Sequence, residues 1–249
     1  MSNAGLPILW AAARSPRDTV SSRPMSVLDR LSGLLSPYGL ILRGAFHPAP
    51  DDDVPQPVST LAMIGNVGRP EGDATWRAFN TARGRFPGSE SLNEWARSVV
   101  EPIARRLGAV ALFPFGAKPP LPFQRWAMRA DRVFPSPLGL LIHPDYGLWH
   151  AYRAALGFAE KLPLPPCAQV ASPCETCAAK PCLAACPVGA FTGSGYDVPR
   201  CVAFLDTPSG ADCMERGCRA RRACPVGADR VHEPAQAQFH MRAFRRGVR

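Results

Sequence analysis

The chain has 249 residues, of which 46% are hydrophobic, and it carries a formal net charge of +9 at pH 7. This length suits one large domain, or a domain of roughly 150 residues with a smaller partner, and the hydrophobic content excludes a wholly disordered chain. No apolar run approaches the ~20 residues that are needed to span a bilayer, so we expect a cytoplasmic protein without a membrane segment.

Helices and strands are expected to alternate between residues 24 and 160, which indicates an α/β or α+β layered domain. Ser26 and Asp29 form a capping-box pattern at the start of the first helix. The clearest helical period covers residues 91–107, with Pro102 on its other face. The expected elements, in chain order, are helix 26–36, strand 39–46, loop 51–53, strand 59–64, helices 74–83 and 91–107, buried strand 109–115, helix 122–131, and strands 138–142 and 148–158.

Composition divides the chain into four parts. The mixture of Ser, Arg and Pro in residues 1–23 predicts a disordered tail, and residues 24–161 form the layered domain, which is expected to bind a cofactor or substrate. The Leu-Pro-Leu-Pro-Pro run at 162–166 predicts a stiff linker, after which residues 167–232 are rich in Cys, Ala, Arg and Gly. Residues 233–249 predict a basic helix or tail with a frayed, solvated end. The arginines of this segment are Arg242, Arg245, Arg246 and Arg249.

Cysteines are concentrated in the C-terminal third of the chain. Eight of the nine lie between Cys174 and Cys224. An odd number of cysteines is atypical of a secreted disulfide protein, and a reducing cytoplasm favours metal ligation by such a group. Cys167, the ninth, is expected to be an incidental thiol rather than a ligand.

The spacing of these cysteines predicts two [4Fe-4S] clusters. A run of the form Cys-x2-Cys-x4-Cys-x3-Cys-Pro begins at Cys174, and its Cys-Pro-Val-Gly-Ala box at Cys186 recurs at Cys224. In bacterial ferredoxins, the cysteine before such a proline ligates the other cluster. We therefore expect a crossed assignment, with Cys174, Cys177, Cys182 and Cys224 on cluster 1 and Cys186, Cys201, Cys213 and Cys218 on cluster 2.

The layered domain and the cysteine module together resemble two known families. The run from Leu140 to Trp149, Leu-Leu-Ile-His-Pro-Asp-Tyr-Gly-Leu-Trp, with the proline-rich link and two-cluster module that follow, is similar to epoxyqueuosine reductase. Ser-Pro-Tyr-Gly-Leu at 36–40 and the Ile-His-Pro run resemble the CblC family of cobalamin-processing proteins. The resemblance covers about residues 25–230. It implies a nitroreductase-like, CblC-like domain that holds a corrinoid, or in distant relatives FMN, beside a bis-[4Fe-4S] ferredoxin-like domain.

The resemblance also implies an activity. Electrons would pass from a reduced flavodoxin or ferredoxin-type donor through the clusters to the corrinoid, and then to a small-molecule substrate. Epoxyqueuosine reductases carry an acidic proton donor before the helix that corresponds to 122–131. Here Lys118 is followed by two prolines, and no acidic residue lies between Gly116 and Ala130. This departure argues against epoxyqueuosine reduction and favours reduction of a corrinoid or of another substrate.

Six residues of the first domain are candidates for a cofactor pocket. His143 precedes a Pro/Gly turn at the end of a strand, where binding loops are common, although a lone histidine there is more often structural. Tyr146 and Trp149 could stack on a planar cofactor or belong to the core, and two basic side chains could hold phosphate or amide groups or be solvated. The candidates are His143, Tyr146, Gly147, Trp149, Lys118 and Arg125.

Two alternatives to an iron–sulfur reductase remain open. The first is a stand-alone ferredoxin-type electron carrier whose first domain only docks partners. The second is a zinc-stabilised nucleic-acid-binding protein, because paired cysteines also bind zinc, although zinc does not account for the repeated Cys-Pro-Val-Gly-Ala box. Two clusters of net charge about 2− would lower the charge of the protein to roughly +5, so RNA is a possible partner but not a required one.

Overall fold

The computed structural model describes residues 25–70, 72–88, 91–166, 170–192 and 195–248. The tail predicted at 1–23, Cys167 and Arg249 lie outside these residues. No helix in the described part of the chain is both long and apolar enough to cross a membrane.

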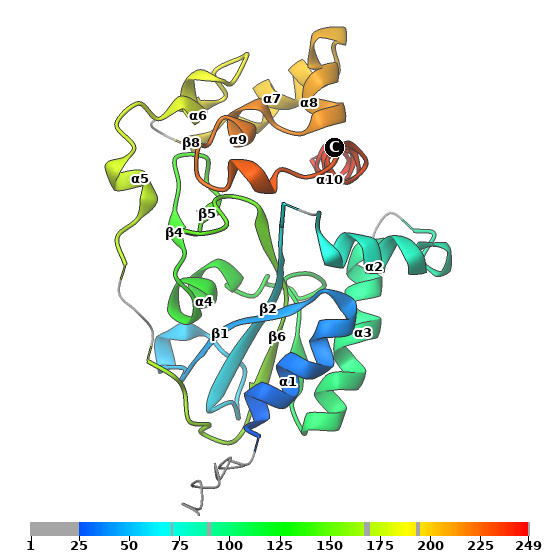
Figure 1. Cartoon of the computed structure of the whole chain (residues 1–249), viewed down its shortest axis with the longest axis vertical. Coiled ribbons are helices and arrows are strands. Elements are labelled where there is room, and N and C mark those ends of the chain that lie inside the picture. Colours follow the sequence, from blue (N-terminus) through cyan, green and yellow to red (C-terminus); the bar gives the residue numbers. More distant parts are fainter. Residues whose placement is uncertain (1–24, 71, 89–90, 167–169, 193–194, 249) are drawn as a thin grey trace, which may run out of the picture.

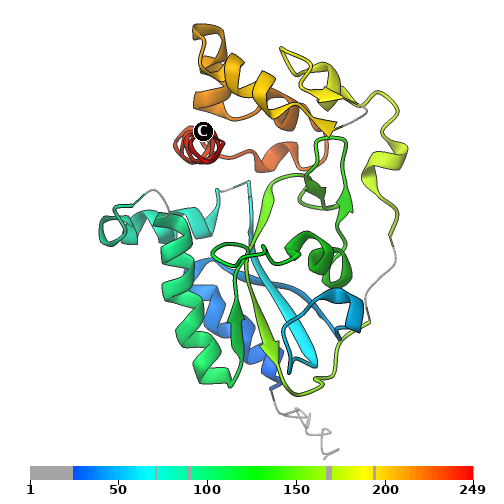
Figure 2. The ribbon, with the colours of Figure 1, turned by 180° about the vertical axis from the view of Figure 1, so that it is seen from behind.

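The first part of the chain is a mixed α/β domain built on one antiparallel sheet (Figures 1 and 2). The strand order is β1-β2-β6-β3, and β2 and β6 occupy the centre. The bounds of these strands are β1 Ile41–Phe46, β2 Thr60–Val67, β3 Val110–Leu112 and β6 His150–Phe158. A separate two-stranded ribbon joins β4 Phe134–Pro135 and β5 Leu141–Ile142.

Helices cover both faces of this sheet, because the alternate residues of β2 point to opposite sides. Ala62 and Ile64 belong to the core beneath the first three helices, whereas Leu61 and Met63 pack against the fourth. All eight residues of β2 are therefore buried. The helices are α1 Val27–Leu35, α2 Ala74–Ala82, α3 Ser91–Leu107 and α4 Phe123–Ala130.

Each of the strands beside β2 contains one extra residue, and that residue is an arginine. The pairing of β1 with β2 shifts register between Leu42 and Gly44, which leaves Arg43 unmatched. The pairing of β2 with β6 shifts between Ile64 and Gly65 of β2, which leaves Arg153 of β6 unmatched. A bulge of this kind re-aims the side chain that it carries, and bulges are frequent beside functional sites.

Most of the expected elements of the first domain are confirmed. Helix α3 has the bounds expected from its period, and Ser26 with Asp29 forms the capping box of α1. The buried strand expected at 109–115 is wrong, because β3 is a short edge strand in which Val110 is 57% exposed. The strand expected at 138–142 contracts to the two residues of β5. The loop expected at 51–53 overlaps a 3-10 turn at Pro50–Asp52.

The cysteine-rich segment consists of short helices and a two-stranded ribbon of β7 Phe191–Thr192 and β8 Gly195–Tyr196, and a longer C-terminal helix runs beside them (Figure 1). The segment expected as a basic helix or tail is a helix, α10, and Arg242 and Arg246 near its end are exposed. Its Gln236 donates a hydrogen bond to Asp73 (2.9 Å), and the Phe239 ring lies 5.3 Å from that of Trp76, so contacts with α2 hold it in place. The helices are α5 Pro173–Thr176, α6 Pro181–Ala184, α7 Val198–Leu205, α8 Ala211–Arg216, α9 Arg219–Arg222 and α10 Pro234–Gly247.

The proline-rich run between the two parts begins inside the first domain. Leu162 is buried in the core, its N–H donates to the Thr60 hydroxyl (2.9 Å), and its carbonyl lies 2.9 Å from His47 Nε2. The first residue of the expected linker is therefore anchored to the sheet.

Two glycines allow the cysteine-rich segment to contact the turn after β5. Gly147 and Gly227 both have left-handed backbones, with φ of +56° and +71°. A Cβ atom on Gly147 would lie 1.9 Å from the Val226 carbonyl oxygen, and one on Gly227 would lie 2.7 Å from the Tyr146 carbonyl oxygen. The two backbones meet without room for a side chain, so the second Cys-Pro-Val-Gly box packs directly on this turn.

Replacing Gly227 with alanine should weaken this contact, and Gly189 provides a matched control. Gly189 holds the same place in the first box, has φ of +57°, and has open space where a Cβ would lie. Both substitutions carry a left-handed penalty of about 1–2 kcal/mol. Because only Gly227→Ala adds a steric overlap, we expect it to lower the free energy of unfolding by about 1–3 kcal/mol more than Gly189→Ala. Urea unfolding of anaerobically purified proteins measures this difference, and equal losses would contradict the contact.

Candidate functional site

The eight described cysteines of the C-terminal segment fall into two electrostatic groups, and none of them forms a disulfide. Burial and then the charge of neighbouring thiols raise the pKa of Cys174, and its neighbours are Cys224, Cys182 and Cys177. These four thiols come from α5, α6 and the second Cys-Pro box, so residues up to 50 positions apart meet.

The second group contains Cys186, Cys201, Cys213 and Cys218. Burial raises the pKa of Cys201 and Cys218, and Cys213 is an electrostatic neighbour of both. All four thiols line one cavity of about 470 Å³, which we call the thiol cavity. Its other walls are mainly apolar and include Phe191, Tyr196, Phe204, Leu205 and Phe244.

Among the residues that the structure describes, no three Cys, His, Asp or Glu side chains are placed to hold a metal ion. Backbone N–H groups nevertheless approach the sulfurs. The Ala190 N–H donates to Cys186 Sγ at 3.3 Å, within the first Cys-Pro-Val-Gly-Ala box.

A second cavity, of about 320 Å³, lies where the sheet domain meets the cysteine-rich segment, and we call it the junction cavity. It shares Leu140, Arg221 and His240 with the thiol cavity, so the two spaces adjoin. Among the residues that the structure describes, no acidic side chain lines it. Its lining is Asn66, Gln124, Leu140, Leu141, Leu148, His150, Ala151, Tyr152, Arg153, Arg221, His232 and His240.

The histidines of the junction cavity are held in their neutral form. Burial, followed by the charges of Arg153 and Arg221, lowers the pKa of His240 to about 3. Burial likewise lowers the pKa of His150 to about 3 and that of His232 well below its usual value. The cavity is therefore surrounded by neutral imidazoles and charged guanidinium groups at pH 7.

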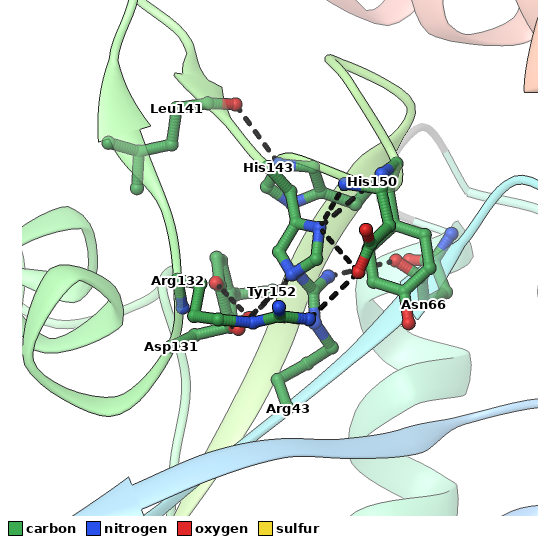
Figure 3. A network of polar contacts seen from close by, with 10 residues as sticks. Arg43, Asn66, Asp131, Arg132, Leu141, His143, His150 and Tyr152 are labelled. Atoms are coloured by element: carbon green, nitrogen blue, oxygen red, sulfur yellow. Dashed lines mark hydrogen bonds and ion pairs between the residues drawn. The ribbon is translucent and has the colours of Figure 1, made fainter. Parts of the chain in front are cut away.

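A buried polar network surrounds Asp131, directly after α4 (Figure 3). Arg43 contacts the Asp131 carboxylate through Nε (2.9 Å) and Nη2 (2.7 Å), and the Tyr152 hydroxyl donates to it at 2.8 Å. Burial alone would raise the pKa of Asp131. The hydrogen bond from His143, the Arg43 guanidinium and the Tyr152 hydroxyl outweigh burial and lower this pKa to about 2.

The contacts of His143 fix its tautomer. Its Nδ1 accepts hydrogen bonds from the backbone N–H groups of Asp145 (3.0 Å) and Tyr146 (3.3 Å), so Nδ1 carries no proton. In the neutral ring the proton therefore lies on Nε2, which is 3.5 Å from Asp131 Oδ1. The imidazole also stacks on the Tyr146 ring, with centroids 4.3 Å apart.

The candidate pocket residues have different surroundings. His143 and Tyr146 line a cavity of about 310 Å³ beside β1 and Asp131, and Gly147 contacts the second Cys-Pro box. Trp149 is buried between the Arg221 guanidinium (4.3 Å from its ring) and the His232 ring (5.1 Å).

The two basic candidates lie elsewhere. Arg125 forms an ion pair with Asp53 on the surface (2.5 Å). Neither Lys118 nor Arg125 is among the residues that line the cavities beside His143.

Sequence reasoning did not select Arg43, Asp131, Arg153 or the three histidines of the junction cavity. A charged residue in an otherwise apolar strand was the available signal for both arginines, since buried charges are rarely found without a partner. Asp131 gave no such signal, because it follows a helix end, where an acidic residue is ordinary.

No family model matches the chain, and no curated protein matches it. The chain is similar to three solved structures of epoxyqueuosine reductase. One, labelled with selenomethionine, is 14% identical with a TM-score of 0.44, and the match covers 86% of this chain and 69% of the other. A second, with an epoxyqueuosine-modified tRNA-Tyr stem loop, is 13% identical with a TM-score of 0.44 and the same coverage. The third, from Bacillus subtilis, is 15% identical with a TM-score of 0.47 and covers 84% and 68% of the two chains. Similarity at this level assigns neither a substrate nor a cofactor to this protein.

The Asp131 network predicts a specific loss of stability in acid. Because the folded pKa of about 2 lies below the usual aspartate pKa of 3.8, the ionised carboxylate adds stability above pH 4 that is lost as the pH falls toward 2. The free-energy gap between the wild type and Asp131→Asn should therefore shrink by about 2 kcal/mol between pH 6 and pH 2. Urea unfolding across this range measures the gap. Asp53→Asn, which breaks only the exposed pair with Arg125, is the control and should cost less than about 1 kcal/mol throughout.

Proposed function

We propose that this protein is an iron–sulfur oxidoreductase that passes electrons through two [4Fe-4S] clusters to an acceptor bound in the junction cavity. The observation that carries the proposal is the adjacency of the two cavities. Four thiols line the thiol cavity, and that cavity shares Leu140, Arg221 and His240 with the junction cavity, which no carboxylate of the described residues lines.

The cysteines fit two clusters held by crossed ligands. Cys174, Cys177, Cys182 and Cys224 would hold cluster 1, and these are the thiols that act on one another electrostatically. The four thiols of the thiol cavity would hold cluster 2, and its apolar walls and the Ala190 N–H suit a cluster with few water contacts. When bound, such clusters supply one-electron transfer steps.

The residues around the junction cavity would receive an acceptor that gains negative charge on reduction. Arg153 and Arg221 supply positive charge, and the half-buried imidazoles of His232 and His240 supply hydrogen bonds. Because no acidic side chain of the described residues lines the cavity, a reduced and more negative acceptor meets no negative charge in the cavity lining itself.

The corrinoid implied by the resemblance does not fit the junction cavity. A volume of about 320 Å³ lies near the lower end of the roughly 300–1,000 Å³ of pockets for drug-sized ligands, and a whole corrinoid is larger than such ligands. A larger cavity of about 750 Å³ lies between residues 83–91 and α10, and no cysteine lines it. The planar ring of FMN or a small substrate suits the junction cavity better. Titration of the protein with cobalamin tests this choice, because a perturbed cobalt absorption band would show that the protein binds a corrinoid after all.

The first test is the composition of the purified protein. After anaerobic purification we expect about eight irons and eight labile sulfides per chain. Cys174→Ser should lose close to half of both, because it removes a ligand of one cluster. Cys167→Ser is the matched control, since Cys167 is the one cysteine outside the two groups, and it should retain the full content. Zinc without sulfide would overturn the proposal.

The second test separates crossed from uncrossed ligation. If Cys186 ligates cluster 2, then Cys186→Ser should alter the same electron paramagnetic resonance signal of the reduced protein as Cys201→Ser. Cys182→Ser and Cys224→Ser should alter the other signal. The crossed assignment is wrong if Cys186→Ser and Cys182→Ser change one common signal.

A further inference from the structure

The junction cavity contains two guanidinium groups that lack carboxylate partners among the described residues. Arg153 donates through Nε to the Asn66 side-chain oxygen (2.9 Å), and its two terminal nitrogens form no hydrogen bond with a described residue. Arg221 donates through Nε and Nη2 to the Leu148 carbonyl oxygen (3.2 and 2.6 Å) and lies over the Trp149 ring. Both side chains line the cavity.

The carboxylate that influences Arg153, that of Asp73, is already occupied by neutral donors. Asp73 Oδ1 accepts from the N–H groups of Thr75 (2.9 Å) and Trp76 (3.2 Å), where it caps α2. Its Oδ2 accepts from the amides of Asn66 (2.6 Å) and Gln236 (2.9 Å). Asn66 therefore joins Asp73 to Arg153 and separates their charges.

Two like charges in a partly buried cavity are costly unless an anion neutralises them. Burial lowers the pKa of both Arg153 and Arg221, and the charge of Arg153 contributes to the lowering of the pKa of Arg221 to about 10. The bulge in β6 is the feature that aims Arg153 out of the regular pairing of the sheet. Its counterpart Arg43, in the β1 bulge, reaches Asp131 instead.

We propose that Arg153 and Arg221 form a binding site for an oxyanion group, a carboxylate or phosphate, carried by a small apolar molecule. The guanidinium of Arg153 presents two terminal nitrogens that form no hydrogen bond with the described residues, and these match the two oxygens of such a group. Leu140, Leu141 and Leu148 line the same cavity and would contact the apolar part of the ligand. That this ligand is the electron acceptor rests on the function proposed above, whereas the site itself does not.

Binding of benzoate and phenyl phosphate to the cluster-loaded protein tests the site, with benzyl alcohol as the neutral analogue. We expect calorimetry to show binding of at least one of the two anions, and binding of benzyl alcohol weaker by at least about tenfold, since the alcohol cannot form charge-assisted hydrogen bonds with the guanidinium groups. Equal affinities for the anions and the alcohol, or no anion binding, would overturn the proposal. The stronger of the two anions identifies the group.

Substitution of Arg153 locates the site. Arg153→Gln should weaken anion binding about 10- to 100-fold. Arg153→Lys keeps the charge but loses the paired N–H donors of the guanidinium, so its affinity for the anion should lie between those of Arg153→Gln and the wild type. Arg125→Gln is the matched control, because Arg125 lies outside the cavity, and it should bind as the wild type does. An equal loss in Arg125→Gln would overturn the proposal.

The experiment remains decisive if Arg153→Gln fails to fold, because the comparison of anions with benzyl alcohol uses the wild type. Iron and sulfide are measured on each sample. Full cluster content without anion binding would overturn the anion site alone, whereas anion binding by a protein that assembles no clusters would overturn the electron-transfer function alone.

Discussion

A backbone-to-backbone contact between two turns holds the cysteine-rich segment on the sheet domain. Gly147 and Gly227 approach so closely that neither position has room for a Cβ atom. The contact fixes the distance between the second Cys-Pro-Val-Gly box and the sheet. It thereby also positions Cys224, which lies three residues before Gly227. Arg221, on the helix before this box, is then placed over Trp149 and bonded to the Leu148 carbonyl. One steric constraint therefore brings the cysteines, the junction cavity and the end of β6 together.

The two bulges beside β2 have different consequences, although each carries an arginine. Arg43 reaches the buried carboxylate of Asp131, which also accepts from Tyr152 and lies next to His143, so its charge is balanced within the fold. Among the described residues, Arg153 donates a hydrogen bond only to the amide oxygen of Asn66. Both bulges lie beside β2, but in the described part of the chain only the β1 bulge has a carboxylate within reach. The β1 bulge therefore stabilises the turn after β5, and the β6 bulge leaves positive charge for a ligand.

Local patterns in the sequence were sufficient where neighbouring residues decide the outcome. The period of residues 91–107 located α3, and the cysteine spacing indicated the two groups of thiols that the proposal assigns to clusters. Patterns failed where distant residues decide. Arg43 and Asp131 are 88 positions apart, so their pairing could not be read from either segment. The packing of the first half of α10 was also missed, because the aromatic contact of Phe239 with Trp76 depends on another domain.

The positive charge of the chain has an internal use near the junction. Arg43 is buried and Arg221 lies over a buried indole, so these two arginines are not presented on an open surface. Cys218, an electrostatic neighbour of Arg221, belongs to the group that would hold cluster 2. A guanidinium beside a cluster stabilises its reduced, more negative form and so raises its reduction potential. The same Arg221 faces the junction cavity, where it would stabilise negative charge on an acceptor. Arg221 would stabilise the added electron both on cluster 2 and on the acceptor. Its effect on the driving force of electron transfer therefore largely cancels, while the energetic cost of the added negative charge is lowered at both places.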